Sequence, residues 1–195
     1  KITTHTEIAV SPEDDIELRR VTIVNQSRDK RVIEVTSYAE VVLNDPASDQ
    51  AHRSFSNLFV ETQIIKPLQA ILCHRRPRYD SEKFPWMLHL MAVHGGRALG
   101  ASYETDRGRF LGRRRTVVNP VAMEEQGRLS DSEGSVLDPI VSIRNRIELA
   151  PDESVVIDYV TGLCEDREAA APLMEKYRDR NLADRVFNLA WTQGQ

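Results

Sequence analysis

Cysteine, aromatic residues and long apolar runs are all scarce in this sequence. Only two cysteines occur among the 195 residues, and Cys73 and Cys164 lie far apart in apolar segments. Two free, buried thiols are therefore favoured over the alternative of a disulfide between them, and no thiolate metal site is expected. No run approaches the roughly 20 apolar residues that span a bilayer. The expectation is a soluble, extramembrane domain that makes no direct membrane contact.

Catalytic signatures are absent as well. The sequence contains no Gly-x-Ser-x-Gly elbow, no cysteine nucleophile motif and no phosphate-binding P-loop. Its five histidines show no metal-ligand spacing, and His89 and His94 fall on opposite faces of one expected strand. Acidic residues are plentiful, so they do not single out the carboxylate pair of a glycosidase. We expect no metal, no cofactor and no complete active site.

What the chain does contain is material for a core and a nearly balanced charge. Hydrophobic residues make up 41% of it, and 26 basic residues against 30 acidic ones give a net charge of −4. A binder of nucleic acid would show a basic excess, so no nucleic-acid partner is expected. The chain begins at Lys1 in a strand-like pattern, with neither an initiator methionine nor a signal peptide. We therefore expect a piece of a larger protein.

Alternation of apolar and polar residues predicts a mostly-β fold, a large antiparallel sandwich of about nine to twelve strands. The pattern is clear from the first residues, where the apolar or β-branched side chains fall on even positions. The expected strands are 2–10, 16–24, 31–43, 58–64, 69–74, 87–93, 116–122, 141–149 and 154–162.

The sequence also predicts how some strands connect. The change of parity between Leu18 and Val21 predicts a β-bulge at Arg19 and Arg20. A polar turn at 25–29 predicts a hairpin between its flanking strands, and the turn at 151–153 predicts a second hairpin. The segment 44–49 is expected to be a loop.

The C-terminal end changes to a helix-prone composition from Asp166 onward. Pro172 predicts the start or a kink of one helix, and Asn181 is the expected N-cap of the last one. The apolar stripe of that helix has no obvious partner in the chain. We divide the chain into a β domain, 1–165, and a helical linker, 166–195. The stripe comprises Leu182, Val186, Leu189 and Ala190.

The segment richest in chemistry is the arginine-rich segment, residues 103–115, which combines five arginines with two glycines and two acids. We expect an irregular loop. Arginine offers planar, bidentate donors that suit carboxylates, phosphates and sugar hydroxyls. The functional interpretation is contact with a sugar or with a catalytic domain, and the structural alternative is pairing of the arginines with nearby acids. The contact candidates are Glu104, Asp106, Arg107, Arg109, Arg113 and Arg114.

Two further segments are candidates. The basic run 74–79 precedes Trp86, whose ring could stack on a sugar or a partner; the alternative is a solvated loop with Trp86 folded into the core edge. The segment 129–140 contains Asp138-Pro139, which initiates turns, so a role in the fold is favoured over catalysis.

Several motifs occur in a fixed order and cover nearly the whole chain. Together they resemble the N-terminal domain of the family 36 glycosyltransferases, now grouped with the cellobiose and chitobiose phosphorylases. The resemblance is greatest to the phosphorylase-like region of cyclic β-1,2-glucan synthases. The motifs are residues 21–25, Ser37-Tyr38-Ala39-Glu40, Phe55-Ser56-Asn57-Leu58-Phe59-Val60-Glu61-Thr62, Glu104-Thr105-Asp106-Arg107, Phe110-Leu111-Gly112-Arg113, and Gly134 with Val136-Leu137-Asp138-Pro139-Ile140.

This resemblance implies a β-supersandwich similar to galactose mutarotase, followed by a helical linker and an (α/α)6 barrel. Since the barrel of that family holds the general acid and the phosphate site, a noncatalytic domain is implied, with the barrel of the same chain as partner. The sandwich supports the barrel, contributes to dimer contacts and can lend loop residues to the sugar site; the arginine-rich segment is our candidate for that contribution. A β-glucan and a second copy are the other partners implied. The parent is expected to be bacterial and bound to the inner membrane.

Two alternatives from other functional classes stay open. An autonomous carbohydrate-binding module would need exposed aromatic residues on one sheet face, with Trp86 and Tyr103 as the first candidates, and the aromatic content of 6% argues against it. A mutarotase-like enzyme acting alone would need a histidine and a carboxylate that converge on the sugar ring. The sequence shows no such pair.

Overall fold

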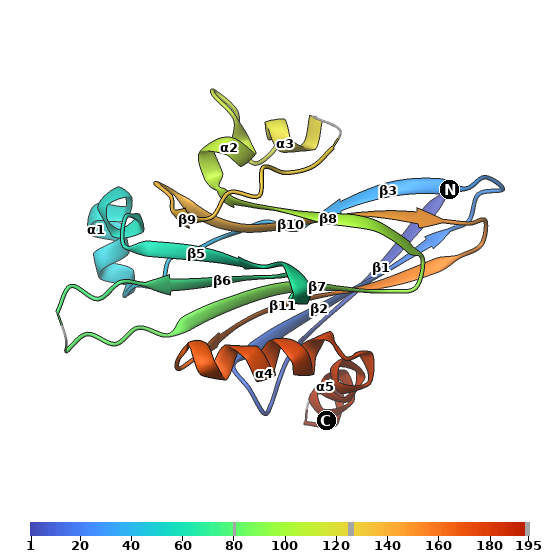
Figure 1. Ribbon diagram of the computed structural model, residues 1–195. Coiled ribbons are helices and arrows are strands. Elements are labelled where there is room, and N and C mark those ends of the chain that lie inside the picture. Colours follow the sequence, from blue (N-terminus) through green and yellow to red (C-terminus); the bar gives the residue numbers. More distant parts are fainter. Residues whose placement is uncertain (80, 125–126, 194–195) are drawn as a thin grey trace.

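In the computed structural model, which describes residues 1–79, 81–124 and 127–193, two antiparallel sheets face each other and helices lie on both outer surfaces (Figure 1). The larger sheet has seven strands in the order β1-β2-β11-β7-β6-β5-β9, and in the smaller sheet β3, β4 and β8 all pair with β10. The expected mostly-β sandwich is confirmed. The strands are β1 (Ile2–Val10), β2 (Ile16–Asn25), β3 (Arg31–Thr36), β4 (Ala39–Glu40), β5 (Val60–Ile65), β6 (Ala70–Arg75), β7 (Trp86–His94), β8 (Arg97–Asp106), β9 (Gly134–Ser135), β10 (Pro139–Leu149) and β11 (Ser154–Cys164).

The helices occupy three places around the sandwich. Short helices lie on the smaller sheet, longer helices lie on the larger sheet, and a further helix lies at the end of the sandwich (Figure 1). They are α1 (Pro46–Asn57) at the end, α2 (Arg107–Leu111) and α3 (Val121–Glu124) on the smaller sheet, and α4 (Arg167–Arg178) and α5 (Arg180–Gln193) on the larger one; a single 3-10 turn, η1 (Lys66–Leu68), joins β5 to β6.

The larger sheet is covered on both faces in its central strands, whereas its edge strand β1 is mostly exposed. Its inner face packs against the smaller sheet through residues such as Ile157 and Met91, and its outer face packs against α4 and α5 through residues such as Leu88 and Leu90. Burying both faces removes far more apolar area from water than one face could, and this area supplies most of the stabilisation of a domain this size. Cys73 is free and buried in the inner core, whereas Cys164 is free but only half-buried.

Two-sided burial also explains why the expected bulge in β2 is wrong. The register of β2 runs without a shift against β1 and against β11. Leu18 belongs to the core under the helices, and Ile23 belongs to the core between the sheets. The apolar positions therefore change parity because the covered face changes along a regular strand.

Both expected hairpins are wrong as well. β3 pairs with β10 in the smaller sheet, so the turn after β2 carries the chain from one sheet to the other. β11 pairs with β2 and β7, so the turn after β10 makes a similar crossing. Asn25 holds both crossings at one point, because its buried amide donates to the carbonyl oxygens of Asp29 and Leu149. The expected strand at 31–43 is split into β3 and β4.

Two further expectations, a loop at 44–49 and a strand at 116–122, were wrong, and both concern segments that are largely exposed. The expected loop at 44–49 contains the start of α1, whose N-cap is Asp45 with Pro46 in the first turn. The expected strand at 116–122 is a turn followed by α3, and Val118 there is 89% exposed. Its β-branched residues have no sheet to pack against, which is what gives such residues their strand preference.

The C-terminal helices are fixed to the larger sheet. α4 begins after its cap, Asp166, and continues through Pro172 without a break at that residue, while Asp179 accepts the first free N–H groups of α5. The expected starts at Pro172 and Asn181 are therefore wrong by a few residues. The buried stripe of α5 is also rotated from the expected one: it contains Ala183 and Val186, with Phe187 and Ala190 partly buried beside them.

Candidate functional site

The arginine-rich segment is less irregular than the sequence predicts. Its first four residues end β8, the next five form α2, and only the part from Gly112 onward is loop. The helix starts there because the Asp106 carboxylate accepts hydrogen bonds from the backbone N–H groups of Gly108 (2.8 Å) and Arg109 (3.4 Å). Asp106 is thus an N-cap, a position where aspartate is strongly preferred.

Glu104 is buried and binds only groups of its own chain. Its carboxylate accepts the backbone N–H groups of Thr105 (3.1 Å) and Asp106 (3.0 Å), and the hydroxyls of Ser130 (2.6 Å) and Ser132. These bonds hold the extended segment that carries Ser130 and Ser132, which precedes β9, against the end of β8. All the hydrogen bonds that the structure gives this carboxylate serve the fold.

Arg107 lies at the centre of a charged cluster. Its guanidinium donates to Glu40 Oε1 at 3.0 Å, to the hydroxyl of Tyr38 at 3.2 Å and to Asp138 Oδ2 at 3.2 Å. Glu40 also pairs with Arg53 of α1. Burial by itself raises the pKa of Glu40, but hydrogen bonds from Arg53 and Tyr38 outweigh burial, so this pKa lies below its ordinary value.

A cleft of about 520 Å³ opens beside this cluster. Arg107 and Asp138 form one side of it, and the last residues of α1 form the other. The lining mixes charged and apolar groups, since Leu58 and Leu137 are both exposed there. The complete lining is Arg53, Ser54, Asn57, Leu58, Arg107, Leu137 and Asp138.

Residues from separate sequence motifs converge on this cluster. Asn57 donates to Asp138 at 3.0 Å, and the Thr62 hydroxyl donates to Thr105 at 2.8 Å. The motifs at 37–40, 55–62, 104–107 and 136–140 therefore meet in one hydrogen-bonded region. Arg107 was a candidate from the sequence, whereas its partners Glu40 and Asp138 were not, although both stand within the motifs described above.

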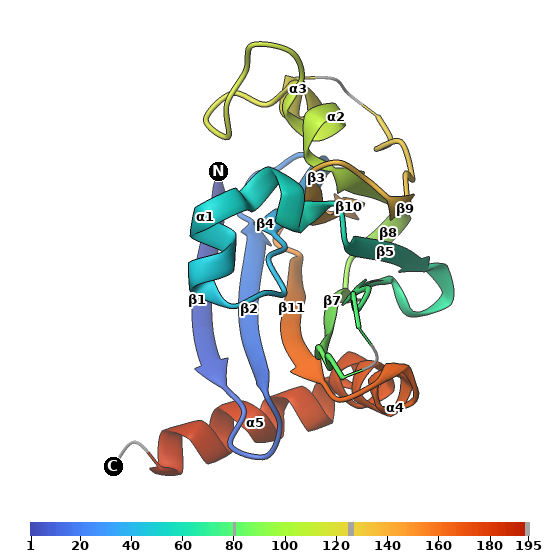
Figure 2. The ribbon, with the colours of Figure 1, turned by 90° about the vertical axis from the view of Figure 1, so that its left-hand side faces the viewer.

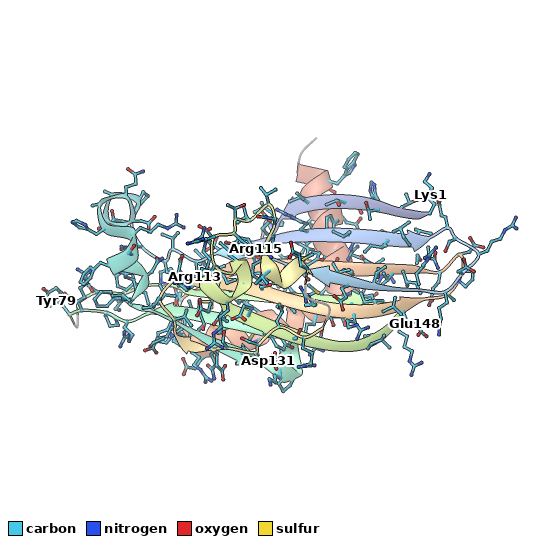
Figure 3. All side chains as sticks on the ribbon, turned by 90° about the horizontal axis from the view of Figure 1, so that it is seen from above. Lys1, Tyr79, Arg113, Arg115, Asp131 and Glu148 are labelled. Carbon is cyan, nitrogen blue, oxygen red and sulfur yellow. The ribbon has the colours of Figure 1, made fainter. Side chains whose placement is uncertain are left out.

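The other arginines of the segment divide into paired and unpaired ones. Arg109 lies 3.7 Å from the Asp106 carboxylate, and Arg115 pairs with Glu124 of α3. Arg113 and Arg114 are exposed, and no carboxylate within the described ranges lies at ion-pairing distance from them. Arg113 and Arg115 lie on the side of the molecule that carries α2 and α3, as seen from above (Figure 3).

Trp86 is not part of this arrangement. It begins β7 on the outer face of the larger sheet, where its indole stacks on the His74 ring with centroids 4.3 Å apart and packs against the core under α4. The arginine-rich segment covers the opposite layer (Figure 1). The structure brings Glu104, Asp106, Arg107 and Arg109 together. Arg113 and Arg114 lie beyond them at the exposed end of the arginine-rich segment, which we call its tip. Trp86 is separated from all of these residues.

The described residues include no group of three or more His, Cys, Asp and Glu side chains arranged to hold a metal ion. None of the helices that the structure describes combines the length and the apolar character that a membrane crossing requires.

Residues 1–180 match the family model of the glycosyl hydrolase 94 supersandwich domain. The chain belongs to this family. It is 34% identical over 194 residues to the cyclic β-(1,2)-glucan synthase NdvB of Rhizobium meliloti (strain 1021), a match that covers 100% of the chain and 7% of that protein. It is also 28% identical over 174 residues to the N,N′-diacetylchitobiose phosphorylase of Vibrio proteolyticus, covering 89% of the chain and 20% of that protein.

These matches confirm the family that the motifs predicted. The supersandwich is the two-sheet body described above. Because the chain spans only 7% and 20% of the two relatives, it corresponds to one part of much larger bacterial proteins.

Proposed function

We propose that this glycosyl hydrolase 94 supersandwich chain is a noncatalytic domain of a glucan-processing transferase or phosphorylase, and that it supports the catalytic (α/α)6 barrel of the same protein. The observation that carries the proposal is that both acids of the arginine-rich segment bind groups of the fold itself. Glu104 binds two backbone amides and two serine hydroxyls, and Asp106 caps α2. A general acid or base must be free to reach a substrate, and these carboxylates are committed to the fold.

Two surfaces remain for contact with the rest of the protein. The first is the tip of the arginine-rich segment, where Arg113 and Arg114 are exposed and offer planar donors for a carboxylate or a sugar. The second is the C-terminal end of α5, where Trp191 is 75% exposed. In this proposal residues 166–195 are the linker from the β domain, 1–165, toward the barrel, and an inner-membrane location of the parent protein remains a prediction.

The test uses the 195-residue chain and the full-length protein that contains it. The chain alone should show neither phosphorolysis nor glucosyl transfer with β-1,2-glucan. In the full-length protein, the double charge reversal Arg113→Glu/Arg114→Glu should lower activity about tenfold, the effect of losing roughly 1.4 kcal/mol of interaction. The matched control, Arg28→Glu/Arg31→Glu, changes the charge equally at two exposed residues, one in the turn after β2 and one at the start of β3, and should stay within about twofold.

Kinetics separate the two roles of the tip. If it contacts sugar, KM rises while kcat holds; if it contacts the barrel, kcat and thermal stability fall together. Turnover by the isolated chain would refute the noncatalytic assignment. Equal effects of the two double variants would refute a contact role for the tip.

A further inference from the structure

A groove opens between the two sheets on the side of β1 and β2. These strands and β11 lie side by side in the larger sheet (Figure 2). β1 is the edge strand, and the smaller sheet does not cover it, so Ile8 and Val10 are 57% and 66% exposed. The groove has a volume of about 350 Å³, within the usual range of about 300–1,000 Å³ for small-ligand pockets. Its lining is Glu17, Arg19, Thr36, Ser37, Tyr38, Ala39, His89, Tyr159 and Thr161.

The floor of this inter-sheet groove comes from three neighbouring strands. Arg19 lies opposite Tyr159, and Glu17 lies opposite Thr161, which in turn lies opposite His89. Residues at alternate positions of a strand share one face, so these five side chains project from the inner face of the larger sheet. They place a guanidinium, a carboxylate, a phenol ring and a hydroxyl side by side.

His89 fixes the base of the groove. It is 4% exposed, and its ring nitrogens contact the hydroxyls of Ser37 at 2.9 Å and Thr161 at 2.8 Å. Ser37 belongs to the edge of the smaller sheet and Thr161 to the larger sheet, so the imidazole bridges the two. Burial lowers the pKa of His89 to about 4, so the ring is neutral at physiological pH. With both nitrogens occupied it is a positioning residue.

The wall of the groove is the edge of the smaller sheet between β3 and β4. Ser37 directs its backbone N–H to the carbonyl of Ile143 in β10. In an extended chain the residues on either side direct their backbone groups the other way. Thr36 and Tyr38 therefore present backbone donors and acceptors to the groove, while the Tyr38 ring packs on Phe110 outside it.

We propose that the inter-sheet groove binds a neutral gluco-oligosaccharide, a proposal that rests on the glucan-processing function proposed above. Glu17 and Arg19 form an ion pair at 3.2 Å, so together they add no net charge and favour a neutral ligand. Their planar groups match pairs of neighbouring hydroxyls, and the Tyr159 ring offers an apolar face to a sugar ring. The polar floor disfavours an apolar peptide, and the edge of the smaller sheet supplies further hydrogen bonds.

The test is an NMR titration of the 195-residue chain with linear β-1,2-gluco-oligosaccharides, with cellobiose and N,N′-diacetylchitobiose for comparison. Saturable shifts are expected for amides of β2, β11 and the segment 36–39. Arg19→Ala and Glu17→Gln should each weaken binding at least about tenfold, as loss of a charged hydrogen bond does. Arg146→Ala is the matched control, because Arg146 is as exposed as Arg19, at 50%, and also pairs with a glutamate, but lies in the smaller sheet. It should leave the Kd unchanged.

Three outcomes would overturn the proposal: no shift at millimolar sugar, equal weakening by Arg19→Ala and Arg146→Ala, or shifts confined to the tip of the arginine-rich segment. The last of these would move the sugar site while leaving the proposed function intact. Failure of the proposed function is detected separately, by glucan turnover in the isolated chain. Accelerated exchange between the two anomers of a bound reducing sugar would also count against the noncatalytic assignment, and would make the groove a mutarotase site.

Discussion

On the outer face of the larger sheet, the Asp158 carboxylate accepts hydrogen bonds from Nε and Nη2 of Arg20 at 2.7 and 2.9 Å. The Asp158 side chain is fully buried. The Arg20 guanidinium also forms an ion pair with Asp184 and lies over the Phe187 ring, and both of these residues belong to α5. The pair therefore connects β2 and β11 to the C-terminal helix. We predict that this contact determines how firmly α5 is held.

The variant Asp158→Asn should lower the free energy of unfolding by about 3–5 kcal/mol, because it removes the buried carboxylate partner of Arg20 and leaves only the more exposed Asp184. Urea denaturation measures the change. Glu17→Gln is the control, since it breaks the exposed pair with Arg19 and should cost less than about 1 kcal/mol. Equal losses in the two variants would contradict the prediction.

The same pair predicts an acid-dependent loss of stability. Burial works against the charge of Asp158, but the hydrogen bonds from Arg20 outweigh it, so the pKa of Asp158 lies below its ordinary value. A carboxylate with a lowered folded pKa contributes stability above its unfolded pKa of about 4 and loses that stability as the pH falls through the folded pKa. The wild-type chain should lose stability steeply below about pH 4, and Asp158→Asn should flatten this part of the profile.

Glu104 gives a second prediction, about local order. Glu104→Gln keeps the shape but removes the charge that four donors share, so we expect a loss of about 2–3 kcal/mol. Hydrogen exchange should quicken in residues 129–132, the segment bound to Glu104, before it quickens in the strands of either sheet. Glu175→Gln, on the exposed face of α4, is the control and should stay within about 0.5 kcal/mol. Unchanged exchange at 129–132 would mean that Glu104 does not organise this segment.

The strands were predictable where one face of each is covered, because burial imposes the alternation that the sequence shows. In β2 the same alternation suggested a bulge that is not there, because the buried side chains change from the outer face at Leu18 to the inner face at Ile23. It also missed α1, whose first ten residues are mostly exposed and so carry no apolar stripe. Only its cap, Asp45 followed by Pro46, marked the start of that helix.

The connections between strands and the residues around Arg107 could not be predicted, because both are determined by contacts between residues that are far apart in the sequence. A polar turn is equally suited to a hairpin and to a crossing between sheets, so the partner of β3 could not be read from its own residues. Arg107 was identifiable as a reactive type of residue, but its partners Glu40 and Asp138 lie 67 and 31 positions away. The inter-sheet groove was missed because strands distant in sequence supply its lining.

The two thiols should react at very different rates. Cys73 is fully buried, and burial raises its pKa to about 12, so almost no reactive thiolate forms at neutral pH. Cys164 is half-buried at the end of β11, where burial also raises its pKa. Native protein treated with iodoacetamide should gain one adduct, at Cys164, and a second only after unfolding. Native Cys164→Ser should gain none; labelling of Cys73 in that variant would contradict this burial.

Tyr177 gives the last prediction, because its buried ring fixes α4 to the turn between β1 and β2. The Tyr177 hydroxyl contacts Ser11 at 2.9 Å and donates to Asp14 Oδ2 at 2.7 Å. Tyr177→Phe removes these bonds and leaves Asp14 short of a donor, so we expect a loss of about 1–3 kcal/mol in the free energy of unfolding. Tyr79→Phe, at an exposed ring, is the control and should change it by less than about 0.5 kcal/mol.

The alkaline limb of the stability profile tests the same contact independently. Burial, followed by the hydrogen bond to Asp14, raises the pKa of Tyr177 to about 12, against about 10 for a free tyrosine. Since the folded chain favours the neutral phenol, the stability that this group contributes is complete below about pH 10 and is lost as the pH rises toward 12. Urea denaturation at a series of pH values should show this loss in the wild type, and Tyr177→Phe should reduce its slope. A slope that is unchanged in Tyr177→Phe would mean that other groups cause the alkaline loss and that this hydroxyl does not anchor α4.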